Sequence, residues 1–122
     1  MGAMASAMVV KHKEKEIVVI DFSGSDFEDV IKAIETAKCL IRTRPKNSVL
    51  TLTDATQARF TPAVTRVLKD FVRDNAPYVK AGAVVGLTGI VKTIYDAVIR
   101  YSGRDLPTFP DREAAMEWLV HQ

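Results

Sequence analysis

Short runs rich in valine and isoleucine alternate along this chain with longer segments whose apolar residues recur every three or four positions. These runs lie at residues 9–10, 17–20, 49–53 and 83–87, and a fifth, weaker candidate at residues 106–109 has leucine and phenylalanine instead. Such apolar runs are typical of buried strands. The spacing of three or four residues in the longer segments is typical of a helix with one buried face. Strands that alternate with helices in this way predict an α/β fold with a largely parallel sheet and right-handed crossovers.

The predicted element order is ββαβαβαβα, with about five strands in a mixed, mostly parallel sheet and four helices. A polar stretch at residues 11–16 separates the first two strands and predicts an antiparallel hairpin. Pro107 limits the last strand to a short edge strand, because proline cannot donate to a β-ladder. Each predicted helix follows residues that suit its first turn: Ser25 or Asp26, Thr61 with Pro62, Thr88, and Asp111.

The length and composition indicate one globular domain. The chain has 122 residues, of which 48% are hydrophobic and 26% are charged, as in ordinary globular domains. We expect residues 8–122 to form this domain. Residues 1–7 are interpreted as an expression remnant or a disordered N-terminus, although Gly2 with Ser6 also fits a myristoylation pattern.

The charge and the apolar patterning exclude several classes of protein. A formal net charge of +2 with 7% aromatic residues provides neither a strong field nor many stacking surfaces for nucleic acid. No apolar run approaches the ~20 residues of a membrane span, and no basic segment precedes an apolar one as in a signal peptide. We therefore expect a cytoplasmic protein whose only membrane contact is peripheral.

The first predicted helix carries two features that bear on function. Cys39 is the only cysteine of the chain and lies inside this helix. A lone cysteine without an activating neighbour is expected to be a buried, inert thiol. Three basic residues cluster where the helix is predicted to end: Arg42, Arg44 and Lys46.

Two carboxylates are predicted at the same edge of the sheet. Asp21 and Asp54 each follow a strand, and open α/β sheets bind ligands beyond the carboxyl ends of their strands. Such a pair can hold a divalent cation or a phosphate, as in phospho-receiver domains. Those domains need a lysine after the last strand, where this chain has Pro107 and Thr108. Aspartates at these places more often cap helices and shape turns.

Other chemistry-bearing patterns are missing from the sequence. There is no catalytic triad, nucleophile elbow or zinc pattern, and His12 and His121 lie near opposite ends of the chain. The glycine-rich segment at residues 82–89 matches no phosphate-binding motif, so close packing is its favoured role. We therefore expect a protein that is not an enzyme, with no catalytic residue, no metal and no cofactor.

The second half of the chain carries a family resemblance. Gly86-Leu-Thr-Gly89 is followed by Tyr101-Ser-Gly103-Arg104, Phe109-Pro-Asp111 and Ala114-Ala-Met-Glu-Trp118-Leu119. This succession resembles the SpoIIAA-like proteins of the STAS group, over about residues 9–120. That family is similar in fold to anti-sigma-factor antagonists and to lipid-carrying CRAL-TRIO domains. The resemblance implies a non-enzymatic domain that binds an apolar ligand or associates with membranes, with a homodimer as one form.

The chain departs from the anti-sigma-factor antagonists at their phosphorylated serine. Those proteins carry an Asp-Ser-Ser-Gly-like segment at the start of the helix that follows the central strand. Here residues 58–63 read Ala-Arg-Phe-Thr-Pro-Ala. Thr61 stands near the place of the serine, without the acidic neighbour and the glycine. N-capping is its favoured role, and a phosphorylation switch is the alternative.

Three hypotheses for the function follow. The first is a module that binds an apolar, lipid-like ligand or a membrane surface through the second and third helices. Its candidate lining residues are Phe60, Val64, Leu68, Ile90, Val91, Ile94 and Tyr95. The candidates for meeting an acidic head group are Arg59, Arg66 and Lys92. The second hypothesis is a regulatory protein-interaction domain that acts through Thr61. The third is a small metal- or phosphate-binding enzyme that uses Asp21 and Asp54.

Overall fold

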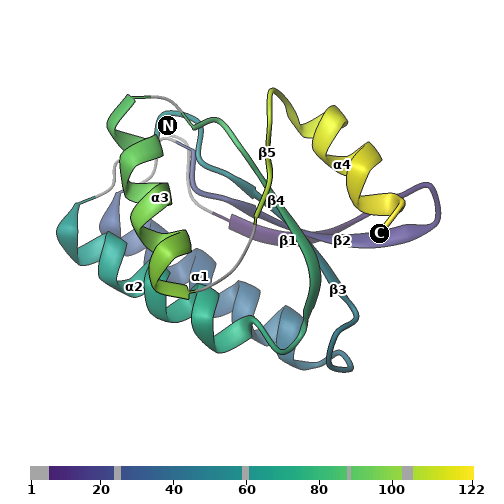
Figure 1. Cartoon of the computed structure of the whole chain (residues 1–122). Helices are drawn as coiled ribbons and strands as arrows, with labels where there is room; N and C mark the ends of the chain where they lie inside the picture. Colours follow the sequence, from purple (N-terminus) through teal and green to yellow (C-terminus); the bar gives the residue numbers. More distant parts are fainter. Residues whose placement is uncertain (1–5, 24–25, 59–60, 88, 103–105) are drawn as a thin grey trace.

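A computed structural model describes residues 6–23, 26–58, 61–87, 89–102 and 106–122. The chain forms five strands and four helices (Figure 1). In chain order these are β1 (Ser6–His12), β2 (Lys15–Asp21), α1 (Phe27–Arg42), β3 (Val49–Asp54), α2 (Pro62–Asn75), β4 (Val79–Val85), α3 (Gly89–Ser102), β5 (Thr108–Phe109) and α4 (Arg112–Val120).

The strands form one mixed, mostly parallel sheet. Their order across the sheet is β1-β2-β3-β4-β5. The hairpin pair β1–β2 is antiparallel, and the three remaining pairs are parallel. The predicted α/β class, with a sheet of about five strands and four helices, is therefore confirmed at this level.

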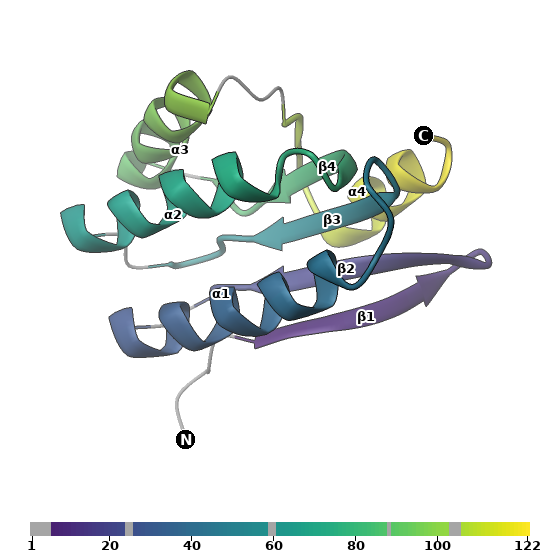
Figure 2. The same ribbon diagram turned by 90° about the horizontal axis from the view of Figure 1, so that it is seen from below.

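The helices divide unequally between the two faces of the sheet. α1, α2 and α3 cover one face, where they form a core cluster with Val18 and Ile20 of β2. α4 covers the other face, and its Leu119 packs in a second cluster with Ile17 and Leu52 (Figures 1 and 2). Right-handed crossovers between neighbouring parallel strands place the connecting helices on the same face. α4 follows the last strand, so it is free to cover the opposite face.

The strand boundaries differ from the sequence-based expectation by several residues, most of all at the starts of β1 and β4. β1 begins at Ser6, so its first two residues lie before the expected domain boundary at residue 8. β4 begins at Val79 rather than at residue 83, because its first half contains the exposed Lys80 and small residues instead of an apolar run. Backbone pairing with β3 extends over this polar half, which hydrophobicity alone does not indicate.

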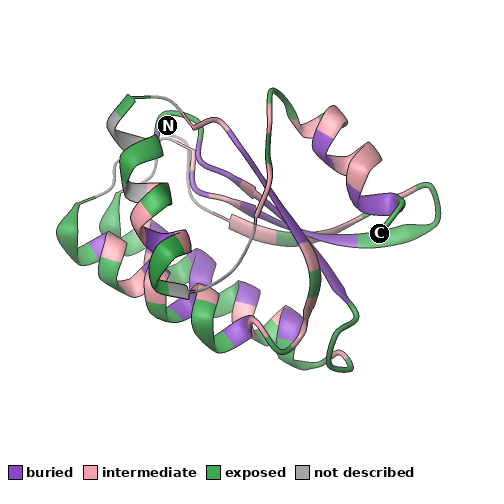
Figure 3. Ribbon diagram, in the orientation of Figure 1, coloured by how far each residue is buried: buried purple, intermediate pink, exposed green. Residues whose placement is uncertain are grey.

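The burial pattern of α1 corrects the prediction for Cys39. The buried face of the helix consists of Val30, Ala33, Ile34, Ala37 and Ile41. Successive residues of an α-helix are rotated by ~100° about the helix axis. Cys39 is two residues away from both Ala37 and Ile41, so it lies about 200° around the axis from each and points away from the buried face. Cys39 is exposed. Figure 3 shows how buried and exposed residues alternate along the helices. The prediction of a buried thiol is therefore wrong.

The tip of the β1–β2 hairpin is tied to α4 by ionic contacts. His12 Nε2 lies 2.9 Å from Glu117 Oε1, and Lys13 Nζ lies 2.7 Å from the same oxygen. Hydrogen bonds from Lys13 and His12 lower the pKa of Glu117 to about 2. His12, which the sequence leaves isolated, is thus part of a contact between residues more than a hundred positions apart.

Candidate functional site

The carboxyl ends of β2 and β3 bring Asp21 and Asp54 side by side. These two residues are register partners in the parallel pair, as their positions at the ends of two strands predict. The guanidinium of Arg112, the first residue of α4, bridges the two carboxylates. Its Nε donates to Asp54 Oδ2 at 2.7 Å, and its Nη2 donates to Asp21 Oδ2 at 2.9 Å.

The second oxygen of each carboxylate is used by the turn that follows its strand. Asp21 Oδ1 accepts a hydrogen bond from the backbone N–H of Ser23 at 2.8 Å. Asp54 Oδ1 accepts one from the backbone N–H of Thr56 at 2.9 Å. Both carboxylates therefore shape a turn with one oxygen and bind Arg112 with the other.

The electrostatics of this cluster favour the ionised form of Asp54. Burial raises the pKa of Asp54, but hydrogen bonds from Thr56 and Arg112 outweigh this effect and hold the pKa below its usual value. Burial lowers the pKa of Arg112, while the two aspartates raise it by a larger amount. The positive charge of Arg112 is thus paired with the negative charges of Asp21 and Asp54.

This arrangement bears directly on the metal hypothesis. The position between the two carboxylates, where a cation would sit, is taken by the guanidinium of Arg112. Within the described part of the chain, no group of three or more histidine, cysteine, aspartate or glutamate side chains is placed to hold a metal ion. A metal ion would first have to displace Arg112, so the geometry favours a structural role for the pair.

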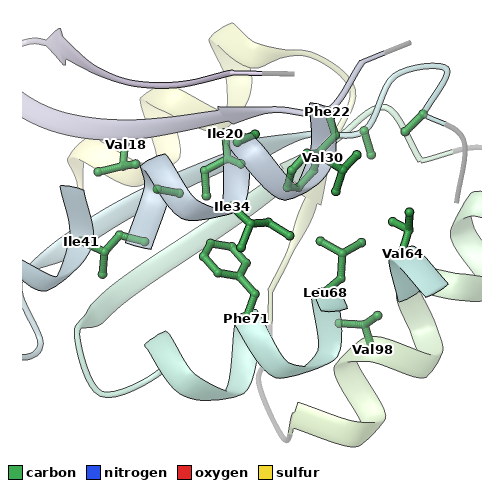
Figure 4. Packing of buried hydrophobic residues seen from close by; sticks show 14 of the residues in the cluster. Val18, Ile20, Phe22, Val30, Ile34, Ile41, Val64, Leu68, Phe71 and Val98 are labelled. Carbon is green, nitrogen blue, oxygen red and sulfur yellow. The ribbon is translucent and has the colours of Figure 1, made fainter. Parts of the chain in front are cut away.

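A small apolar cavity lies between α2, α3 and the sheet. Its volume is about 60 Å³. Apart from Thr53 and Tyr95, its lining is wholly apolar. The lining residues are Phe22, Thr53, Ala55, Leu68, Val72, Val84, Leu87, Tyr95, Val98, Ile99 and Leu106. Figure 4 shows how Leu68 of α2 and Val98 of α3 approach each other beside this space.

A second cavity of about 40 Å³ adjoins the first beneath α2. The two share Thr53, Val72 and Leu106 as lining residues. Asn75 also lines the second cavity and is buried. Its Nδ2 donates to the carbonyl of Phe71, whereas its Oδ1 has no hydrogen-bond partner among the described residues. This otherwise apolar region therefore contains one unused hydrogen-bond acceptor.

The structure brings together only part of the predicted apolar site. Leu68 and Tyr95 line the cavity. Val64 is fully buried in the neighbouring core and does not line it. Phe60, together with the side chains of Ile90, Val91 and Ile94, lies outside the described residues.

The predicted head-group residues do not gather at the cavity. Arg66 of α2 and Lys92 of α3 are exposed, and neither lines the cavity. Lys92 instead borders a separate surface hollow beside Phe109 and Pro110. Arg59 lies outside the described residues.

Thr61 occupies the N-cap position of α2, as the sequence predicts. Its side-chain oxygen accepts a hydrogen bond from the backbone N–H of Val64 at 3.2 Å. The residue is exposed, and Pro62 follows it in the first turn. Asp26 and Asp111 cap α1 and α4 in the same manner, which confirms two further predicted caps.

Comparison of the chain with protein-family models and with curated proteins finds no match. The resemblance to the SpoIIAA-like proteins therefore stays a prediction. Among the described residues, no helix combines the length and the apolar character needed to cross a bilayer.

Sequence reasoning missed Arg112, which decides the character of the strand-end cluster. A signal for it was present. The N-terminus of a helix disfavours a positive charge because of the helix dipole, yet Arg112 stands at the first position of α4. An arginine at that position after two strand-end aspartates indicates a carboxylate partner. The residues of the cavity wall that come from loops, such as Phe22 and Leu106, carry no periodic signal at all.

Proposed function

We propose that the protein is a non-enzymatic, SpoIIAA-like domain of the STAS type that binds an apolar, lipid-like ligand between α2 and α3. The observation that carries this proposal is the cavity of about 60 Å³ whose lining is apolar except for Thr53 and Tyr95. Binding sites for small molecules are concave and mostly apolar, with few polar groups. The SpoIIAA-like family, which the sequence resembles, is similar in fold to lipid-carrying domains, and this points to the same ligand class.

The present size of the cavity sets a condition on this binding. A ligand site usually has a volume of ~300 Å³ or more, so the cavity as it stands takes only the end of an acyl chain. Deeper binding requires α3 to move away from α2. A ligand that reaches the second cavity with a hydroxyl group would also satisfy Asn75 Oδ1.

The attachment of α3 makes such a movement feasible. Val98 is the only buried residue among the α3 residues whose side chains are described. Two polar contacts also hold α3, one near its middle and one near its C-terminal end. The hydroxyl of Tyr101 accepts a hydrogen bond from Arg73 of α2 at 2.7 Å, and the hydroxyl of Tyr95 donates to the carbonyl of Leu106. Among the described side chains of α3, separating the two helices would therefore expose one buried residue, Val98, and break the hydrogen bond between Arg73 and Tyr101.

Filling the cavity is expected to abolish binding of a fatty acid. We expect decanoate to bind to the delipidated protein with a saturable heat in calorimetry, and Val98→Phe to remove this heat by occupying the cavity. Val67→Phe is the matched control, because Val67 lies on α2 and lines neither cavity. Lipid extraction and mass spectrometry of the freshly purified wild type should find an acyl chain that is absent from Val98→Phe.

Two results would count against this function. One is the absence of both a bound acyl chain and a decanoate signal in the wild type. The other is equal binding by Val98→Phe and Val67→Phe, with both variants shown to be folded by circular dichroism. Equal binding would place the ligand elsewhere on the protein.

The regulatory alternative keeps one supporting observation, the position of Thr61. Its exposed hydroxyl stands at the N-terminus of α2, where backbone N–H groups and the helix dipole stabilise a phosphate. Mass spectrometry of the protein from its native cells should then find a phosphate on Thr61. Thr61→Ala would remove the modified peptide and also cost about 1 kcal/mol of stability through the lost cap. An unmodified Thr61 in all growth conditions would leave only the capping role.

A further inference from the structure

A second, polar hollow lies at the other end of the sheet from the apolar cavity. Its volume is about 350 Å³, and it opens beside the amino ends of β2, β3 and β4. Cationic side chains reach it from three separate segments: Lys15 from β2, Arg44 from the loop after α1, and Lys80 from β4. Its remaining lining residues are Glu16, Val18, Pro45, Ser48, Val49, Leu50 and Gln122.

A β-bulge directs Lys80 to this position. Val49 pairs with Val79 and Leu50 pairs with Ala81, so Lys80 is the extra residue of β4 between two consecutive partners in β3. A bulge re-aims one side chain of a strand, and bulges are frequent beside functional sites. The bulged residue, Lys80, is also the residue of β4 that lines the hollow.

Arg44 is the most buried of the three cations and is only partly neutralised. Its side chain is 31% exposed, and its Nη2 donates to Glu16 Oε2 at 3.1 Å. Its Nε is buried and has no hydrogen-bond partner among the described residues. A buried donor without a partner costs free energy, because it has lost its contact with water. An acceptor bound in the hollow would remove this cost.

We propose that this hollow binds a small phosphomonoester. Glu16 is the only carboxylate side chain among its lining residues, so these side chains carry two more positive than negative charges. A phosphomonoester carries a charge of about −1.5 to −2 near neutral pH. Arginine and lysine are the side chains that bind phosphate oxygens most strongly. The volume lies at the lower end of the range for ligand sites, which suits a phosphate with a few attached atoms.

Glycerol 3-phosphate is a suitable probe for this site. We expect it to bind to the wild type with a saturable heat in calorimetry at constant ionic strength. Lys80→Gln and Arg44→Gln should each weaken this binding at least about tenfold, since each removes one charged donor. Arg42→Gln is the matched control. Arg42 lies in the last turn of α1, is exposed, and does not line the hollow, so this variant loses the same charge elsewhere.

Vesicles that contain phosphatidic acid distinguish a free phosphate from a lipid headgroup. Co-sedimentation that depends on Lys80, without binding of glycerol 3-phosphate, would support the site and identify a headgroup as its source. The proposal is overturned if neither probe binds at millimolar concentration, or if Arg42→Gln weakens binding as much as Lys80→Gln. Because Lys80 is exposed, Lys80→Gln is expected to fold and keeps the test decisive if Arg44→Gln does not.

Discussion

Arg112→Met is expected to lower the free energy of unfolding by about 2 kcal/mol at pH 7. The substitution removes the cation that joins the ends of β2 and β3 to the start of α4, and it leaves Asp21 and Asp54 as adjacent, unpaired carboxylates. Breaking a fully buried pair costs roughly 3–5 kcal/mol. The smaller value applies here because solvent screens a group whose side chain is 41% exposed.

The effect of Arg112→Met should depend on pH in a defined direction. The pKa of Asp54 is lowered in the folded protein, so its contribution to stability is present above the unfolded pKa of ~4. That contribution is lost as the pH falls through the lower folded pKa. In the variant, the hydrogen bonds from Thr56 still oppose the effect of burial, but the contribution of Arg112 is lost, so the pKa of Asp54 is higher than in the wild type. As the pH falls, Asp54 is therefore protonated earlier in the variant, and the difference in stability should shrink as the pH falls through ~4.

Urea unfolding at several pH values measures both effects. Asp54→Asn in the Arg112→Met background should recover part of the lost stability, because it removes one of the two facing charges. Arg100→Met on the exposed side of α3 is the control for loss of a surface cation. If Arg112→Met lowered the free energy of unfolding by less than about 0.5 kcal/mol, with no dependence on pH, the contacts of Arg112 with the two aspartates would contribute no more than an ordinary surface ion pair.

The strand-end cluster shows how far the sequence alone can reach. The alternation of strands and helices places Asp21 and Asp54 at one edge of the sheet, and the structure confirms that they meet. Their partner comes from residue 112, after two further helices and strands. Arg112 reaches the two carboxylates because α4 covers the face of the sheet opposite to the other three helices. Periodicity determines that a helix exists but not which face it covers.

The two cavities and the basic hollow were less accessible to sequence reasoning for a different reason. Helix periodicity finds Leu68, because it lies on the buried stripe of α2. It gives no information on Phe22, Leu87 and Leu106, which lie in loops and complete the apolar cavity. Likewise, the cluster of basic residues after α1 was visible, whereas the bulge that brings Lys80 to Arg44 follows from the pairing of β3 with β4.

Gly86→Ala is expected to lower the free energy of unfolding by about 3 kcal/mol. Gly86 has a φ of +84°, which alanine adopts only with strain. A Cβ atom at this residue would also lie 2.5 Å from the backbone nitrogen of Thr56 and 2.7 Å from its Cα. Because these are backbone atoms, the segment after β3 must move. That movement disturbs the hydrogen bond from the Thr56 N–H to Asp54, and with it the support of the carboxylate that binds Arg112.

Gly89→Ala separates the two causes of this loss. Gly89 also has a positive φ, of +54°, but a Cβ atom there would meet no heavy atom within 4 Å. Gly89→Ala should therefore lower the free energy of unfolding by only about 1 kcal/mol, because only the strained backbone conformation opposes the alanine. Urea unfolding of both variants gives the difference, which is the cost of the close approach between Gly86 and Thr56. If the two variants lose the same stability, the approach is not tight, and the glycine at residue 86 is needed only for its backbone angle.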